Sequence, residues 1–207
     1  MPRVNPFAFF DCLAVSTELR CLLDAVAPAE VHLFTYLACL LSVYRGRPAA
    51  AWGYSFAGTR NGSPYSPELE SSKAMLLQGG YVSLTEAGYL KLTSHGCQEY
   101  ETLAGFSVNS QRIEFLAGAC ASVLTLPVGW IKAAITSDSQ MRLAAQLKTT
   151  RPLLTQAAVD EFYDDFQLLA GALGADVPDL MIPAVVWLRS MKESADVASG
   201  GAQCSTR

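Results

Sequence analysis

The residues best placed for chemistry in this chain form one acidic segment, DEFYDD at positions 160–165. Its spacing puts carboxylates four residues apart on shared faces of a helix, where they could hold a divalent cation or meet a basic protein surface. The four acids are Asp160, Glu161, Asp164 and Asp165. With two histidines in the chain and no second acidic motif, we interpret this segment as a solvated acidic face of a helix.

Other signs of catalysis are missing from the sequence. It contains no G-x-S-x-G, H-E-x-x-H, Walker A or G-x-G-x-x-G motif. His32 is expected to be a helix cap or a surface residue, and His95 lies in the polar stretch TSHG. Acid–base catalysis requires titratable groups that act together in a pocket. The sequence therefore predicts a protein that is not an enzyme and has no cofactor and no metal site.

The six cysteines lie far apart and form no C-x-x-C pair, which disfavours zinc. Four lie in apolar surroundings and are expected to pack as small hydrophobic residues: Cys12, Cys21, Cys39 and Cys120. Pro6 and Asp11 interrupt the apolar N-terminal patch, and no clear cleavage site follows. No run approaches the roughly 20 apolar residues of a membrane span. We therefore expect a cytoplasmic protein without disulfides that does not contact a membrane.

The composition points toward a protein partner. The chain has 207 residues, 51% of them hydrophobic and 16% charged, whereas soluble domains are about 25% charged. Part of this apolar excess is expected to face a partner. The net charge of −4 is shared equally by residues 1–105 and 106–207, so neither half is a basic module.

Periodicity predicts a winged helix in the first half of the chain. Residues 81–84 and 89–93 are β-prone and flank a turn. Ser66, Pro67 and Glu68 are typical of a helix start, and Gly79 follows the last turn. The remaining expected elements are helices over 17–26, 28–46 and 66–78 and an extended segment over 49–56. The third helix of this winged helix would be 66–78.

The second half reads as helical almost throughout. Helices are expected from about 110 to a break or kink at Pro127, and then over 130–135, 139–147, 156–173 and 183–191. The expected fold is mainly α with a small β-hairpin. Its divisions are a winged-helix domain at 1–105, a helical domain at 106–195 and a disordered tail at 196–207.

The third helix is poorly suited to reading DNA. It carries one base, Lys73, against Glu68 and Glu70, and the expected wing adds only Lys91 against Glu86. DNA binding draws much of its affinity from Lys and Arg. The residues that could contact phosphate are Arg45, Arg47 and Arg60. Aromatic and apolar residues around the third helix instead predict a protein-binding surface, formed by Tyr65, Leu69, Lys73, Leu76, Tyr81 and Tyr89.

Two motifs carry a family resemblance over roughly residues 30–93. They are F-x-G-x-x-x-G-S-P-Y-S-x-x-L, from Phe56 to Leu69, and G-Y-V-S-L-T-E-A-G, from Gly80 to Gly88. They resemble the winged-helix domains of small accessory subunits, the middle components of bacterial three-component ABC ATPase systems of the Lamassu anti-phage type. The chain is more loosely similar to toxin–antitoxin winged-helix proteins that carry a Y-G-P turn before the third helix.

The resemblance implies an adaptor subunit that bridges an SMC-like coiled-coil ATPase and an effector nuclease, with DNA reached through the complex. Two alternatives remain open from the sequence. One is a winged-helix regulator or antitoxin that binds DNA as a dimer. The other is a small metal-dependent enzyme that uses the acids of 160–165.

Overall fold

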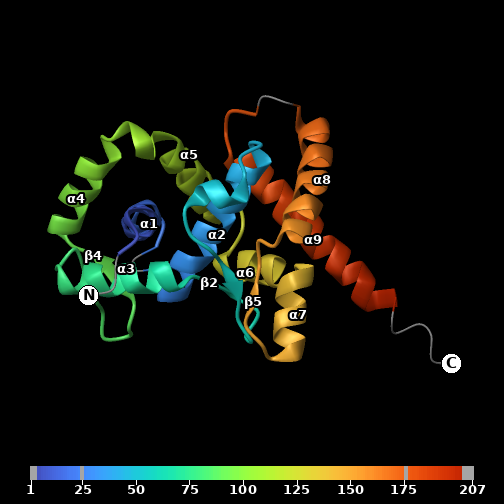
Figure 1. Ribbon diagram of the computed structural model, residues 1–207, viewed down its shortest axis with the longest axis horizontal. Helices are drawn as coiled ribbons and strands as arrows, with labels where there is room; N and C mark the ends of the chain where they lie inside the picture. Colours follow the sequence, from blue (N-terminus) through green and yellow to red (C-terminus); the bar gives the residue numbers. More distant parts are fainter. Residues whose placement is uncertain (1–3, 24–25, 175–176, 202–207) are drawn as a thin grey trace.

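A computed structural model describes residues 4–23, 26–174 and 177–201 of the chain (Figure 1). The fold is mainly α-helical with small antiparallel sheets, as the sequence predicts. The α-helices are α1 (Pro6–Arg20), α2 (Pro28–Tyr44), α3 (Pro67–Gln78), α4 (Ser94–Ala104), α5 (Ser107–Ala121), α6 (Val128–Thr136), α7 (Ser139–Leu147), α8 (Gln156–Leu173) and α9 (Met181–Gly201). The strands are β1 (Ala57–Gly58), β2 (Pro64–Tyr65), β3 (Val82–Leu84), β4 (Leu90–Leu92) and β5 (Arg151–Pro152), and two 3₁₀ helices cover Ala49–Trp52 and Ser122–Leu124.

The first helix begins earlier than the sequence suggests. Asn5 is its N-cap, and the Asn5 side chain accepts hydrogen bonds from the backbone N–H groups of Phe7 and Ala8. Pro6 therefore occupies the first helical position, where its missing N–H costs nothing. Asp11 does not break the helix either, because its carboxylate is paired with Arg112 in the core. The expected helix over 17–26 is thus corrected to Pro6–Arg20.

Helix α2 is the centre of the hydrophobic core. Every residue from 31 to 43 is buried, so the helix is covered on all sides rather than along one stripe. It packs against α1, α5, α8 and α9. Two of its buried hydroxyl groups are satisfied within the helix, since Thr35 donates to the carbonyl of Val31 and Ser42 donates to that of Cys39, whereas the buried Tyr36 hydroxyl has no hydrogen-bond partner among the described residues. One cluster of buried residues joins elements from both halves of the chain.

The predicted hairpin is confirmed. β3 and β4 pair antiparallel, with Val82 opposite Leu92 and Leu84 opposite Leu90. A single bridge between Val26 and Leu90 adds the segment before α2 to this hairpin. The turn between β3 and β4 includes Gly88, which has a φ of 80° that favours glycine.

The extended segment expected at 49–56 is wrong. Ala49–Trp52 forms a 3₁₀ helix that ends at Gly53, whose φ is 91°. The strand that follows, β1, does not join the hairpin. It pairs antiparallel with β2 and with β5, which lies more than ninety positions further along the chain.

The second half is helical, as expected, with different boundaries. α4 was not predicted, and Thr93 begins it by accepting the backbone N–H of Gly96. Helix α5 ends at Ala121, before Pro127, and α6 starts directly after that proline. α9 continues to Gly201, into the segment expected as a disordered tail, and residues 202–207 lie outside the described part of the chain.

The lengths and hydropathy of the helices in the described residues bear on membrane crossing. No single helix there is long and apolar enough to cross a bilayer, and the apolar pair Ser107–Leu124 and Val128–Thr136 is bent by 114°.

Helix α1 is enclosed by its neighbours. In Figure 1 it is seen nearly along its axis, inside an arc made by α3, α4 and α5, all of which contact it. α8 and α9 lie on the other side of α2. Gly118 of α5 lets the residue just before α9 approach closely, because a Cβ added there would stand 2.5 Å from the Cβ of Leu180.

Candidate protein-interaction surface

Helix α3 turns its apolar residues inward. Leu69 and Leu76 are each 1% exposed and belong to the hydrophobic core. Their predicted role in partner binding is therefore wrong, because a side chain buried against α1 has no surface left for another protein. The exposed residues of α3 are Pro67, Ser71, Ala74, Met75 and Gln78, none of which carries a charge.

His32 fixes the start of α3 and is not the cap or surface residue that the sequence suggests. It is buried in α2, and its Nδ1 accepts the backbone N–H of Ser66 at 3.1 Å. Its ring stacks on Tyr65, with 5.1 Å between centroids. An imidazole that accepts at Nδ1 carries its proton on Nε2, which lies 3.6 Å from Oε2 of Glu70. Burial lowers the pKa of His32, and the charge of Glu70 opposes this shift without cancelling it.

Lys73, the one base of α3, is already occupied. Its Nζ lies 2.5 Å from Oε1 of Glu70, one helical turn before it. Burial acts to raise the pKa of Glu70, but the hydrogen bond and charge of Lys73, together with His32, lower it overall. The pair leaves the exposed face of α3 without a free base.

The predicted aromatic residues fall into two groups. Tyr81 packs edge-on against Phe9 and stacks on His95, so it ties the start of β3 to α1 and α4. Tyr65 is half-buried over His32. Tyr89 alone among the six predicted partner residues is classed as exposed, and it lies on the hairpin near the exposed Leu84.

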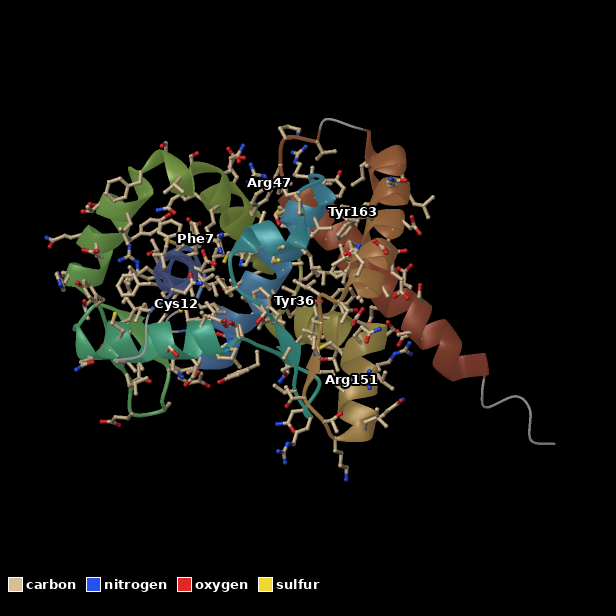
Figure 2. All side chains as sticks on the ribbon, viewed as in Figure 1. Phe7, Cys12, Tyr36, Arg47, Arg151 and Tyr163 are labelled. Carbon is tan, nitrogen blue, oxygen red and sulfur yellow. The ribbon has the colours of Figure 1, made fainter. Side chains whose placement is uncertain are left out.

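The three arginines considered for phosphate contacts lie in two separate segments. Arg45 and Arg47 follow the end of α2, where Arg45 donates to the carbonyl of Val177 and the Arg47 guanidinium lies over the ring of Phe115. Arg60 follows β1, whose Gly58 pairs with Arg151. Figure 2 shows Arg47 and Arg151 at opposite ends of the central part of the molecule, so these bases do not form one patch.

A groove that the sequence did not predict lies at the N-terminal end of α1. It has a volume of about 570 Å³ and is almost entirely apolar. Met75 of α3, Phe106 and Val108 are its most exposed large side chains, at 41%, 54% and 66%. We call this the apolar groove, and its lining is Val4, Pro6, Phe7, Phe9, Phe10, Met75, Glu99, Leu103, Phe106, Val108 and Asn109.

A buried ion pair between Arg112 and Asp11 lies next to Phe7, one of the residues that line the apolar groove. The Arg112 Nε and Nη2 atoms lie 2.5 and 2.7 Å from the two carboxylate oxygens of Asp11, and Tyr54 donates its hydroxyl to the same carboxylate. The Arg112 guanidinium also lies 3.8 Å from the ring centre of Trp52 and 5.0 Å from that of Phe7, which lines the groove. Although burial opposes the charged form, Asp11 raises the pKa of Arg112. This network fixes α1, α5 and the Trp52 segment relative to one another.

The acidic segment 160–165 lies on α8, where part of it borders a second cavity, of about 490 Å³, between α7, α8 and α9. Glu161 and Asp165 face this cavity together with Asp138 of α7's N-cap, and we call it the acidic cleft. Within the described residues, no three His, Cys, Asp or Glu side chains are close enough to hold a metal ion.

The cysteines are free thiols among the described residues, and Cys204 lies outside that part of the chain. Cys12, Cys39 and Cys120 are buried as expected, and burial raises the pKa of each thiol. Cys21 is exposed, so the expectation that it packs in the core is wrong: α1 ends at Arg20.

Comparison with known families, curated proteins and solved structures finds no match for this chain.

Proposed function

We propose that this chain is a non-catalytic adaptor that binds a helical segment of a partner protein in the apolar groove. The observation that carries the proposal is the gathering of exposed Met75, Phe106 and Val108 around one apolar cavity. Large exposed apolar patches on soluble proteins mark interaction sites. Here four elements, α1, α3, α4 and the start of α5, contribute to a single patch.

The lining of the groove favours an amphipathic helix as its occupant. Glu99 is the one charged residue of the lining, and Asn109 is already engaged through its side-chain N–H with the carbonyl of Leu103. A helix that lays apolar side chains at i, i+3, i+4 and i+7 into such a groove needs few polar contacts. Phe9, Met75 and Phe106 would then contact the anchors of that helix.

The resemblance of the segments around Phe56–Leu69 and Gly80–Gly88 supplies the identity of the partner. We propose a bacterial, cytoplasmic complex of anti-phage defence, in which the helix in the groove belongs to an SMC-like coiled-coil ATPase and an effector nuclease binds elsewhere. The order of α1, Val26, α2, α3 and the β3–β4 hairpin supports a winged helix as the fold of this part. DNA is reached through the ATPase.

Direct DNA reading, as a regulator or antitoxin, is the weaker proposal. A helix that enters the major groove brings basic and amide side chains to the bases and phosphates. The exposed face of α3 carries no unpaired base, because Lys73 is paired with the partly exposed Glu70. Lys91 on β4 remains as the exposed base of the hairpin.

The proposal is tested by affinity purification of the tagged protein from its native host after nuclease treatment, with mass spectrometry of the recovered proteins. We expect an ATPase with a long coiled coil and an effector nuclease to be recovered. The double variant Met75→Gln/Phe106→Ser removes two groove anchors, and the serine suits the N-cap position of Phe106. It should lose the ATPase.

The matched control is Leu124→Gln/Leu147→Gln, which changes two exposed apolar residues outside the groove lining. It should retain the ATPase. Recovery of the wild-type protein alone, combined with salt-dependent DNA binding that requires Lys73 or Lys91, would replace the adaptor by the DNA-binding regulator.

A further inference from the structure

The acidic cleft lies on a different part of the molecule from the apolar groove. The two share no lining residue, and α8 and α9 lie across α2 from α3 and α4 (Figure 1). Three carboxylates, Asp138, Glu161 and Asp165, line the cleft, and Arg142 is the one base of its lining. The cleft is therefore negatively charged in a chain whose overall charge is only −4.

Arg142 lines the same cleft, but within the described part of the chain no ion pair joins any of these carboxylates to it or to another base. Asp138 accepts hydrogen bonds only from backbone N–H groups of its own helix. Burial raises the pKa of Asp165, and the neighbouring charges of Glu161 and Asp164 raise it further. The cleft thus holds partly dehydrated acids that repel one another and would gain from an incoming cation.

The rest of the lining combines four serines with apolar residues, one of which, Trp187, has an unsatisfied N–H. Trp187 is 4% exposed, and among the described residues its indole Nε1–H has no hydrogen-bond partner. Leu168 stands at the edge of the cleft with 76% of its surface exposed. The remaining apolar residues of the lining are Phe162, Leu169 and Met191.

We propose that the acidic cleft binds a segment of a partner protein that carries an arginine or lysine beside an apolar residue. The cationic head would meet Glu161 and Asp165 through charge-assisted hydrogen bonds. Its methylene stem and the apolar neighbour would cover Leu168 and Phe162, since long basic side chains pack their stems on apolar surface. This surface extends the adaptor role to a second partner contact and does not depend on the groove.

Other occupants fit the lining less well. A bare metal ion would need three ligands close together, which the described residues do not provide. A nucleic acid would bring phosphates against Asp138, Glu161 and Asp165. A small polyamine would satisfy the carboxylates and leave the apolar edge at Leu168 uncovered.

The test uses the full chain and a fluorescein-labelled peptide of alternating leucine and lysine, with binding followed by fluorescence anisotropy. The same peptide with glutamate in place of lysine is the charge control. Of the two peptides, we expect only the basic one to bind, with an affinity that falls as salt is added. Glu161→Gln/Asp165→Asn should weaken binding by about tenfold or more.

The matched control is Glu86→Gln/Glu101→Gln, which removes two exposed acids from the hairpin and from α4. It should bind as the wild type does. Leu168→Lys, which introduces a competing base at the edge, should abolish binding without touching any buried residue. The proposal would be overturned if Glu161→Gln/Asp165→Asn and the control Glu86→Gln/Glu101→Gln lost peptide affinity equally, or if neither lost any.

The groove variant Met75→Gln/Phe106→Ser separates the two proposals. It should bind the basic peptide normally even though it is expected to lose the ATPase. A cleft variant that binds the peptide as tightly as the wild type would refute this inference and leave the groove proposal standing.

Discussion

Arg112 connects three parts of the molecule through one side chain. It pairs with Asp11 from α1, lies over Trp52, and contacts the ring of Phe7 at the groove. A buried ion pair is costly to break because the remaining partner stays charged and dehydrated. Arg112 lies on α5, so these contacts hold α1 and the Phe7 side of the groove against α5.

We therefore expect Arg112→Met to lower the free energy of unfolding by about 3–5 kcal/mol, since Asp11 would be left buried without its partner. Urea unfolding followed by circular dichroism measures this change. Lys73→Met is the matched control, because it breaks the partly exposed pair with Glu70 and should cost no more than about 1 kcal/mol. Similar losses of unfolding free energy in both variants would show that the buried Asp11–Arg112 pair contributes no more to stability than the partly exposed Glu70–Lys73 pair.

His32 gives the fold a dependence on pH with a defined sign. Its Nδ1 must stay unprotonated to accept the N–H of Ser66, and burial lowers its pKa below the ordinary value of 6.5. The unfolded chain therefore binds a proton at a pH where the folded chain does not. The contribution of neutral His32 to the free energy of unfolding is therefore fully present above pH 6.5. It is lost as the pH falls from 6.5 through the lower pKa that His32 has in the folded protein.

The wild type should accordingly unfold more easily in urea at pH 5 than at pH 7. His32→Gln should show a smaller difference between these two pH values, because the titrating group is gone. His95→Gln, which changes an exposed histidine, is the control and should keep the wild-type difference. An unchanged difference in His32→Gln would assign the pH dependence to other groups.

At the scale of elements, the approach of the chain before α9 to α5 requires a glycine at position 118. A Cβ at Gly118 would meet the Cβ and backbone of Leu180, the residue just before α9, at 2.5 and 3.2 Å, so this segment would have to move away from α5. We expect Gly118→Ala to cost about 1–3 kcal/mol of stability in thermal or urea unfolding. Gly129→Ala in α6, where no atom lies within 4 Å of an added Cβ, should be neutral or stabilise by up to about 1 kcal/mol. Destabilisation of equal size in both variants would contradict this packing.

Local signals predicted some elements and missed others. α3 could be recognised from Ser66, Pro67 and Gly79, although the Ser66 hydroxyl donates to Glu68 instead of capping the helix. The start of α1 could not, because Pro6 fits a first helical position as well as a break, and Asp11 is tolerated only through Arg112, 101 positions away. The pairing of β1 with β5 could not be predicted for the same reason, because β5 is remote from β1 in the sequence.

The interaction surface was predicted less well than the fold. Apolar residues such as Leu69 and Leu76 are equally consistent with a core and with a partner face, and only the direction in which α3 packs on α1 decides between them. The residues that do form the groove come from four elements. The one local indication for Phe106 and Val108 is that they are an apolar pair at the start of a helix, where both are exposed. His32 was misjudged because its partner Ser66 is 34 positions away.

At the scale of the whole molecule, two surfaces of different chemistry lie on opposite sides of α2. The apolar groove is bounded by α1, α3, α4 and α5, and the acidic cleft by α7, α8 and α9. If both proposals hold, these surfaces lie on either side of a helix that is buried from residue 31 to 43, an arrangement suited to hold two partners at a fixed distance. Figure 2 shows the labelled Tyr163 of α8 close to the end of α2, where its hydroxyl donates to the carbonyl of Arg47 at 3.0 Å.

The most direct test of the groove is photo-crosslinking in the native host with benzoylphenylalanine in place of Phe106. The replacement keeps an aromatic ring at a position that is 54% exposed, so the fold should be unaffected. With the probe at position 106, we expect a covalent adduct with a coiled-coil ATPase. The same probe in place of Leu124 should give no such adduct. An adduct only from Leu124, crosslinking to DNA at Phe106, or no adduct at Phe106 would contradict the claim that the groove holds a partner helix.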